Sequence, residues 1–237
     1  MPKDNILEEI YKHAEKSSPE ESCGILVKVQ GETQFIPCTN VSDNPEHTFA
    51  IGPSDYAKAE DLGTIEVIVH SHVLGSSKPS AADKASCNLS KVPWLIVSVP
   101  NRSETFILPE AVELPYEGRP FFHGVLDCYT IIKDYYKREL NIELLNYYRV
   151  DKWWDKGENK YLDLAEGAGF GIITSEKPKI HDIIVMQVGA SVPNHGAIYL
   201  GNNIILHHVA NRESCKAVYG GFWEKNTWGL LRHQSLM

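Results

Sequence analysis

A proline-rich stretch near the middle of the chain divides the sequence into two halves. Residues 109–120 read PEAVELPYEGRP, which places three prolines within twelve residues. The stretch shows neither helical nor strand periodicity, and proline fixes its own backbone angle and donates no amide hydrogen bond. Such a composition is typical of an extended linker. We therefore predict two domains, residues 1–108 and residues 121–237, joined by a linker at 109–120.

Composition favours a folded protein and argues against nucleic-acid binding and against a membrane span. Apolar residues make up 43% and aromatic residues 10% of the 237 residues, which is ordinary for a chain with a packed core. The net charge is −8 and the sequence has no cluster of Lys and Arg, so we expect no nucleic-acid partner. We find no segment as long as a membrane span and no secretory signal, and therefore expect the chain to stay in the cytoplasm where it is made.

The five cysteines do not form a regular framework of pairs. They are Cys23, Cys38, Cys87, Cys128 and Cys215. An odd number with irregular spacing favours reduced thiols over disulfide bonds. At least one of them is therefore available for thiol chemistry.

Apolar periodicity predicts helices and strands in both halves. In the first half we expect helices over residues 6–14, 54–62 and 80–89, and strands over residues 23–29, 33–38, 64–70, 93–99 and 103–108. In the second half we expect helices over residues 128–140 and 160–168, and strands over residues 181–188, 195–201 and 203–209. The pattern predicts a mixed α/β first domain and an α+β second domain.

Two histidines at the end of a predicted strand suggest a metal site. His70 and His72 are two residues apart, so their side chains point to the same face of the strand and can reach one ion. Asp83 follows a short loop and can supply a third ligand, which leaves a fourth tetrahedral position open for water. A carboxylate such as Glu21 could take a proton from that water, and the Ser80 hydroxyl could donate to a developing oxyanion.

The same residues also admit a simpler interpretation. Ser80 and Asp83 have the spacing of a helix capping box, and Pro79 ahead of them suits the start of a helix. A His-x-His pair is, in addition, often structural. The two interpretations are compatible, because a helix N-terminus can hold a metal ligand in place.

Taken together, the pattern resembles the JAMM motif of the JAB/MPN metallopeptidases. The match is Glu21 in ESCGIL, then HSH at residues 70–72, then Ser80 and Asp83, with no departure at any motif position. The resemblance covers residues 1–108 and implies a cytidine-deaminase-like α/β fold. It further implies that the two histidines and Asp83 bind Zn²⁺, that Glu21 is the general base and that Ser80 polarises the scissile carbonyl. Members of that family cut peptide or isopeptide bonds, often at the tails of ubiquitin-like proteins.

A cysteine and two histidines suggest a second site in the other half. Cys128 begins a predicted helix behind Asp127, and a helix N-terminus favours the thiolate. His195 opens one predicted strand and His207 closes the next, so an antiparallel hairpin would bring both imidazoles together. A cysteine nucleophile needs a base, and that base needs an orienting partner. Each residue alone has a structural alternative, since cysteines and strand histidines are often simply buried.

In this order the residues resemble the NlpC-type papain-like cysteine peptidases. The matching positions are Asp-Cys at 127–128, HGAIYLG at 195–201 and a histidine at 207. The resemblance implies a papain-like α+β fold for residues 121–237. It assigns Cys128 as the nucleophile, His195 as the general base and His207 as the residue that orients this base.

One position departs from that motif. Tyr129 and Thr130 stand where members commonly have Ser-Gly after the cysteine, which leaves the shape of the substrate groove open. His208 points to the opposite strand face from His207, so we expect it to take no part in the site. The family usually cleaves the stem peptides of bacterial peptidoglycan.

The order of the two domains resembles the tail tip assembly proteins of lambda-like long-tailed phages. That resemblance implies a bifunctional chain whose metal site processes a tail component and whose thiol site opens peptidoglycan. It implies other tail tip proteins as partners, a ubiquitin-like tail protein among them, and assembly in the host cytoplasm into the virion tail tip without a signal peptide. Two alternatives stay open: a structural tail adaptor with little catalytic activity, and a bacterial cytoplasmic protease for ubiquitin-like modifiers.

Overall fold

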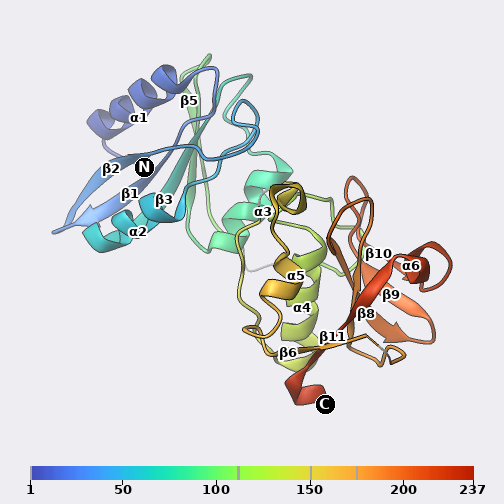
Figure 1. Ribbon diagram of the computed structural model, residues 1–237. Coiled ribbons are helices and arrows are strands. Elements are labelled where there is room, and N and C mark those ends of the chain that lie inside the picture. Colours follow the sequence, from blue (N-terminus) through green and yellow to red (C-terminus); the bar gives the residue numbers. More distant parts are fainter. Residues whose placement is uncertain (1, 111–112, 150, 175) are drawn as a thin grey trace. The chain divides into compact units, whose positions relative to one another are not determined.

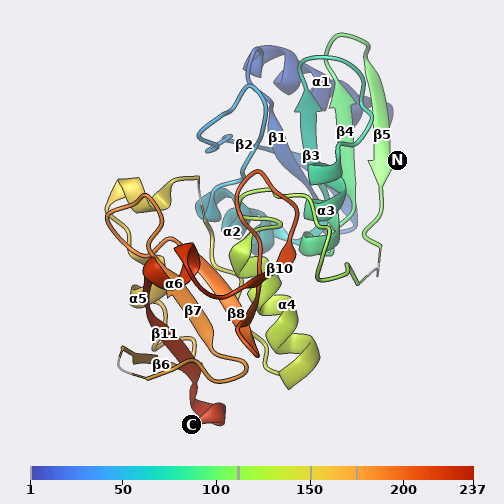
Figure 2. The same ribbon diagram turned by 90° about the vertical axis from the view of Figure 1, so that its right-hand side faces the viewer.

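The computed structural model describes residues 2–110, 113–149, 151–174 and 176–237. The chain forms two compact units, Met1–Val112 and Glu113–Met237, and each unit combines helices with one sheet (Figures 1 and 2). The predicted two-domain mixed α/β fold class is confirmed. Within the described residues, no helix is both long and apolar enough to cross a membrane.

The first unit is built on a five-stranded sheet with the strand order β2-β1-β3-β4-β5. Its strands are β1 (Cys23–Val29), β2 (Glu32–Cys38), β3 (Thr64–His72), β4 (Trp94–Ser98) and β5 (Ser103–Ile107). Its helices are α1 (Asp4–Ser17), α2 (Pro53–Leu62) and α3 (Ala81–Ser90). β3 and β4 are parallel and α3 lies in the crossover between them, whereas the other neighbouring strands are antiparallel.

Helices cover both faces of this sheet, because successive residues of a strand point to opposite sides. In β1, Leu26 packs with the buried face of α1, while Ile25 and Val27 pack with Ala59 of α2 on the other side. The buried face of α1 consists of Ile6, Ile10, Tyr11 and Ala14, at the helical spacing that the sequence predicts. The two helices therefore hold the central strands in place. The two histidines lie at the end of β3.

The second unit contains a six-stranded antiparallel sheet with the order β10-β9-β8-β7-β11-β6. Its strands are β6 (Phe170–Ile173), β7 (Ile183–Met186), β8 (His195–Gly201), β9 (Ile204–His207), β10 (Cys215–Val218) and β11 (Thr227–His233). Its helices are α4 (Cys128–Leu140), α5 (Lys160–Asp163) and α6 (Phe222–Lys225), with 3₁₀ turns at Trp153–Lys156 and Gln234–Leu236.

The core of the second unit forms between α4 and the strands β8 and β9, which lie beside the helix in Figure 1. Ile131, Ile132 and Tyr136 of α4 are fully buried in one cluster with Ile198 of β8 and Leu206 of β9. This packing holds the N-terminal end of α4, where Cys128 lies, against the strand that begins with His195.

Part of the segment predicted as a linker packs into the second unit. The side chain of Arg119 is buried and donates hydrogen bonds to the Leu114 and Pro115 carbonyl oxygens and to Asp134 of α4. The Arg119 backbone N–H donates to Ser214 Oγ at 2.9 Å. The second compact unit, Glu113–Met237, includes these residues.

Several elements near the C-terminus differ from the sequence prediction. The predicted helix over residues 160–168 ends at Asp163, and residues 164–169 form turns instead. The prediction missed β6, β10 and β11. β10 has only four residues, mostly exposed, so it lacks the alternating burial that marks a strand.

Candidate functional site

Three side chains of the first unit form a group that could hold a metal ion. His70 and His72 point to the same side of β3, with 3.3 Å between their Nε2 atoms. Asp83 faces both rings, with Oδ1 at 3.3 Å from His70 Nε2 and Oδ2 at 3.4 Å from His72 Nε2. Two imidazole nitrogens and a carboxylate around one point are the donor set that zinc prefers.

The surroundings of the two rings suit metal binding. His72 Nδ1 lies 2.8 Å from the Ser76 carbonyl oxygen, so Nδ1 carries a proton. When the ring is neutral, this leaves a lone pair on Nε2 for a metal ion. The fully buried His70 ring stacks on Phe49 with ring centroids 4.5 Å apart and meets the edge of Trp94 at 5.4 Å. Both rings are therefore held in place with Nε2 directed at Asp83, and a cation between these atoms would relieve the close approach of two ring nitrogens.

Ser80 and Asp83 form the capping box that their spacing predicts. The Asp83 backbone N–H donates to Ser80 Oγ at 3.1 Å, and the Ser80 backbone N–H donates to Asp83 Oδ2 at 2.7 Å. This pair fixes the Asp83 carboxylate at the start of α3. Because Ser80 Oγ only accepts in the cap and the residue is exposed, its hydroxyl proton can still be donated to another group. Burial disfavours the ionised Asp83, but hydrogen bonds from His70 and His72 outweigh it and hold the pKa of Asp83 well below its usual range.

Glu21 lies just before β1 and is held near the histidines by the next residue. The Ser22 backbone N–H donates to Ser71 Oγ at 2.8 Å, and Ser71 N–H donates to the Ser22 carbonyl oxygen at 3.0 Å. Ser71 is the residue between the two histidines, so this link couples the Glu21 segment to β3. Burial raises the pKa of Glu21 to about 7; the nearby His72 lowers this pKa and Asp83 raises it.

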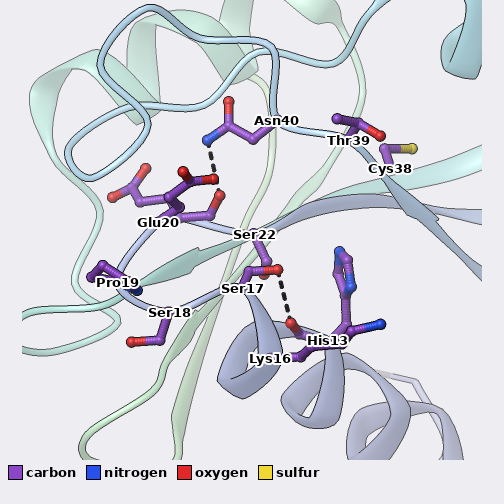
Figure 3. Close-up of a pocket in the computed structure, with 11 residues that line it drawn as sticks. His13, Lys16, Ser17, Ser18, Pro19, Glu20, Ser22, Cys38, Thr39 and Asn40 are labelled. Atoms are coloured by element: carbon purple, nitrogen blue, oxygen red, sulfur yellow. Dashed lines mark hydrogen bonds between the residues drawn. The ribbon is translucent and has the colours of Figure 1, made fainter.

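A polar pocket of about 480 Å³ borders Glu21 (Figure 3). It lies between the C-terminal end of α1 and the segment after β2, with His13 and Lys16 on one side and Asn40 on the other. The Asn40 amide donates to the Glu21 carbonyl oxygen at 2.9 Å, so the wall of the pocket also fixes the Glu21 backbone. The pocket thus lies beside the Glu21 backbone, and His70, His72 and Asp83 are not among its lining residues.

In the second unit, a buried ion pair holds the first turn of α4. Asp127 is the N-cap of α4, and its Oδ1 accepts from the backbone N–H of Tyr129 at 3.1 Å and of Thr130 at 2.9 Å. Arg149 pairs with both Asp127 oxygens, at 2.9 Å from Nε and 3.1 Å from Nη2. The Asp127 and Arg149 side chains are 3% and 6% exposed, so the charge is neutralised inside the protein. Cys128, the next residue, is thereby fixed at the helix start.

Two polar groups, one from Tyr161 and one from Gly196, interact with the Cys128 sulfur. Sγ lies 3.3 Å from Tyr161 Oη and interacts with the backbone N–H of Gly196, the residue after His195. Within the described residues, no hydrogen bond joins Cys128 to His195. We expected the helix N-terminus to lower the thiol pKa, but burial, followed by the Asp127 carboxylate, raises the pKa of Cys128 overall, although Tyr161 and Gly196 work in the other direction. The resting sulfur is therefore a thiol.

The hairpin of β8 and β9 brings the two predicted histidines together. His195 Nε2 lies 3.2 Å from His207 Nδ1, and Trp223 packs against both rings with centroids at 5.8 Å and 4.7 Å. Burial, followed by the charge of His207, lowers the pKa of His195 to about 3, and burial lowers that of His207 to about 4. Both imidazoles are therefore neutral at pH 7.

His208 lies outside this pair. Its ring is buried, packs edge-on against Phe121 at 5.1 Å, and neither ring nitrogen has a hydrogen-bond partner among the described residues. The sequence interpretation missed Tyr161 and the Ser22–Ser71 link, and it favoured a core role for Trp223 without placing it at the two histidines. None of them carries a local signal, because each reaches its site only through tertiary packing.

Two family models match the chain, one for each unit. Residues 3–108 match the prokaryotic homologs of the JAB domain, and residues 118–232 match the NlpC/P60 family. A solved JAB1/MPN domain protein from Archaeoglobus fulgidus is 24% identical, covers 46% of this chain and 91% of its own, and has a TM-score of 0.29. The two family matches thus define a chain with a JAB-type domain followed by an NlpC/P60-type domain.

Two relatives share this arrangement over most of their length. The tail tip assembly protein K of Escherichia phage N15 is 37% identical over 97% of this chain and 95% of the relative. The tail tip assembly protein K of Escherichia phage lambda is 35% identical over 78% of this chain and 90% of the relative. The chain belongs to the family of phage tail tip assembly proteins K.

Proposed function

We propose that the chain is a bifunctional peptidase that takes part in phage tail tip assembly. Its first unit is a zinc metallopeptidase of isopeptidase type, and its second unit is a cysteine endopeptidase that cuts peptidoglycan stem peptides. The observation that supports this most strongly is the convergence of His70, His72 and Asp83 on one point beside Glu21, in a chain that also pairs two neutral imidazoles near Cys128.

In the metal half, each side chain has a separate task. His70, His72 and Asp83 would hold the ion, and zinc bound there would supply Lewis acidity at neutral pH. Glu21, whose pKa of about 7 suits both uptake and release of a proton, is the general base that accepts the proton of the attacking water and passes it to the leaving amine. The Ser80 hydroxyl donates a hydrogen bond to the developing oxyanion and keeps its proton. The pocket beside Glu21 holds part of the substrate chain, and a ubiquitin-like tail protein is the substrate class that we propose.

In the thiol half, Cys128 and His195 are both uncharged at rest, so the proton transfer between them accompanies the attack of the sulfur. His195 accepts the Cys128 proton as the sulfur attacks the carbonyl carbon, which gives a thioester after the amine leaves with that proton. Water then hydrolyses the thioester with His195 again as the base. His207 keeps Nε2 of His195 occupied, which leaves Nδ1 of His195 for the thiol.

The two activities fit the life of a tail component. We propose that the chain is made in the host cytoplasm, that it assembles there with other tail tip proteins, and that it then reaches the virion tail tip. The metal half would process a tail component during assembly, and the thiol half would open peptidoglycan at entry. A structural adaptor with little activity is the alternative, and complementation with Glu21 and Cys128 both replaced separates the two. Full recovery of infectious particles would favour the adaptor.

The metal half is tested by counting zinc in the purified full-length chain. We expect one zinc per chain in the native protein and a loss of that zinc in the His70→Ala, His72→Ala double variant. His47→Ala is the matched control, because His47 is an exposed histidine of the same unit outside the group. Zinc well below one per chain, or zinc that survives the double substitution, would remove the metal site.

The thiol half is tested by digestion of purified peptidoglycan with mass analysis of the products. We expect new stem-peptide termini with the native chain and none with Cys128→Ala. Cys215→Ala, an exposed cysteine of the same unit, should leave the products unchanged. Identical products from native chain and Cys128→Ala would refute the thiol assignment.

A further inference from the structure

The phenol of Tyr161 contacts the sulfur of Cys128, although the two residues are 33 positions apart in sequence. Tyr161 lies in the short helix α5, and its ring packs against the core cluster between α4 and the sheet. Its Oη atom lies 3.3 Å from Cys128 Sγ, within the distance of a hydrogen bond to sulfur. Tyr161 belongs to neither of the two sequence motifs, so only the folded structure brings it into contact with Cys128.

Tyr161 is the donor of this hydrogen bond once Cys128 is ionised. A thiolate can only accept, whereas beside the neutral thiol either atom could be the donor. Burial, followed by the neighbouring Cys128, holds the pKa of Tyr161 well above its usual range, so the phenol keeps its proton at neutral pH. The hydroxyl can therefore donate to the sulfur when Cys128 ionises.

Gly196 provides the space for this hydroxyl. A Cβ atom built on Gly196 would lie 2.6 Å from Tyr161 Oη and 3.0 Å from Tyr161 Cε1. The backbone N–H of the same glycine also lowers the pKa of Cys128. The absence of a side chain at position 196 thus allows two donors, the phenol and the backbone amide, to converge on one sulfur.

We infer that Tyr161 is a further catalytic residue of the thiol site, whose hydroxyl donates a hydrogen bond to the Cys128 sulfur and stabilises the thiolate as it forms. The inference rests on the proposed thiol function. As the S–H bond breaks, the proton passes to His195 and the electron pair stays on sulfur, where the Tyr161 hydroxyl and the Gly196 amide share the new negative charge. Both donors keep their own protons throughout.

The other groups around the sulfur cannot replace this contribution. Asp127 opposes a negative charge at Cys128, and Arg149, which favours it, already pairs with Asp127. His195 begins the strand beside the thiol and is uncharged at neutral pH. The stabilisation of the thiolate by neighbouring side chains thus depends mainly on Tyr161.

The test is the pH dependence of Cys128 alkylation by iodoacetamide in the full-length chain, followed by mass analysis of the peptide that contains Cys128. A hydrogen bond to a charged group contributes a factor of about 10 to 100, so Tyr161→Phe should raise the midpoint of the profile by about 1–2 pH units. Gly196→Ala, which displaces the phenol, should shift it in the same direction. Tyr116→Phe is the matched control, because the Tyr116 hydroxyl bonds to the exposed Glu139 carboxylate, and its profile should match that of the native chain.

Each result decides one question. If Tyr161→Phe is folded by circular dichroism and its midpoint equals the native one, the inference is overturned, even if peptide cleavage has fallen. If Tyr161→Phe does not fold, Gly196→Ala carries the test with the same criterion. A shifted midpoint in a chain that cleaves no peptide supports the hydrogen bond to the thiolate while refuting the proposed peptidase function.

Discussion

Replacing Asp127 by Asn isolates the charge of the buried pair with Arg149. Asn is as good an N-cap as Asp, so its amide oxygen can keep the bonds from the N–H groups of Tyr129 and Thr130. The amide nitrogen, however, then faces two other donors, the Arg149 guanidinium and the N–H of Gly124. The substitution therefore leaves a buried arginine without its counter-charge while the helix cap survives.

The size of the effect follows from burial. Both side chains are almost inaccessible, and breaking a buried ion pair by removal of one partner costs about 3–5 kcal/mol. We expect Asp127→Asn to lower the free energy of unfolding of the second unit by this amount. Arg149→Met should also destabilise the unit, but the double variant should be more stable than the sum of both single effects by about 1–3 kcal/mol.

Urea unfolding followed by tryptophan fluorescence measures this directly. Four of the five tryptophans, Trp153, Trp154, Trp223 and Trp228, belong to the second unit, so the signal reports mainly on that unit. Asp163→Asn, at an exposed aspartate of the same unit, is the control and should change stability by less than about 0.5 kcal/mol. If Asp127→Asn changes stability no more than this control, or if the two single effects simply add, the pair does not stabilise α4 as we argue.

Three further predictions concern stability. Ser71→Ala removes the acceptor of the Ser22 N–H and should cost about 1–3 kcal/mol in urea unfolding; an unchanged midpoint would contradict the link between β3 and the segment before β1. Gly63→Ala should destabilise the first unit by about 1–3 kcal/mol, because its Cβ would lie 2.2 Å from the Lys28 carbonyl oxygen, and native thermal stability would refute this. The folded-state pKa of His207, lowered to about 4 by burial, lies below its unfolded value of about 6.5, so the unfolded chain binds more protons and stability should fall as pH drops from 6.5 to 4. Denaturation at several pH values should show a smaller slope in His207→Gln.

Local patterns were enough to predict how His70, His72 and Asp83 come together. The strand period placed His70 and His72 on one face, and the capping-box spacing placed Asp83 at the first turn of α3. Both features depend on neighbouring residues and on backbone geometry, which sequence spacing expresses directly. The hairpin argument for His195 and His207 succeeded for the same reason, since only two residues separate their strands.

Features that depend on tertiary packing could not be predicted in this way. Tyr161 reaches Cys128 because α5 packs against the start of α4, and no spacing in the sequence marks that contact. The ionisation of Cys128 followed burial rather than the helix N-terminus, and the burial of a side chain at the end of a helix is not visible in a linear pattern. The contact of the Trp223 ring with the two histidine rings likewise depends on tertiary packing.

The central claim is that one chain carries two peptidase sites with separate chemistry. Digestion of purified peptidoglycan by the native chain, run with and without a zinc chelator, tests this most directly. We predict the same stem-peptide fragments in both digests, because the Cys128 site needs no metal, and no fragments from Cys128→Ala in either. Loss of the fragments in the presence of chelator, or their persistence in Cys128→Ala, would contradict the claim.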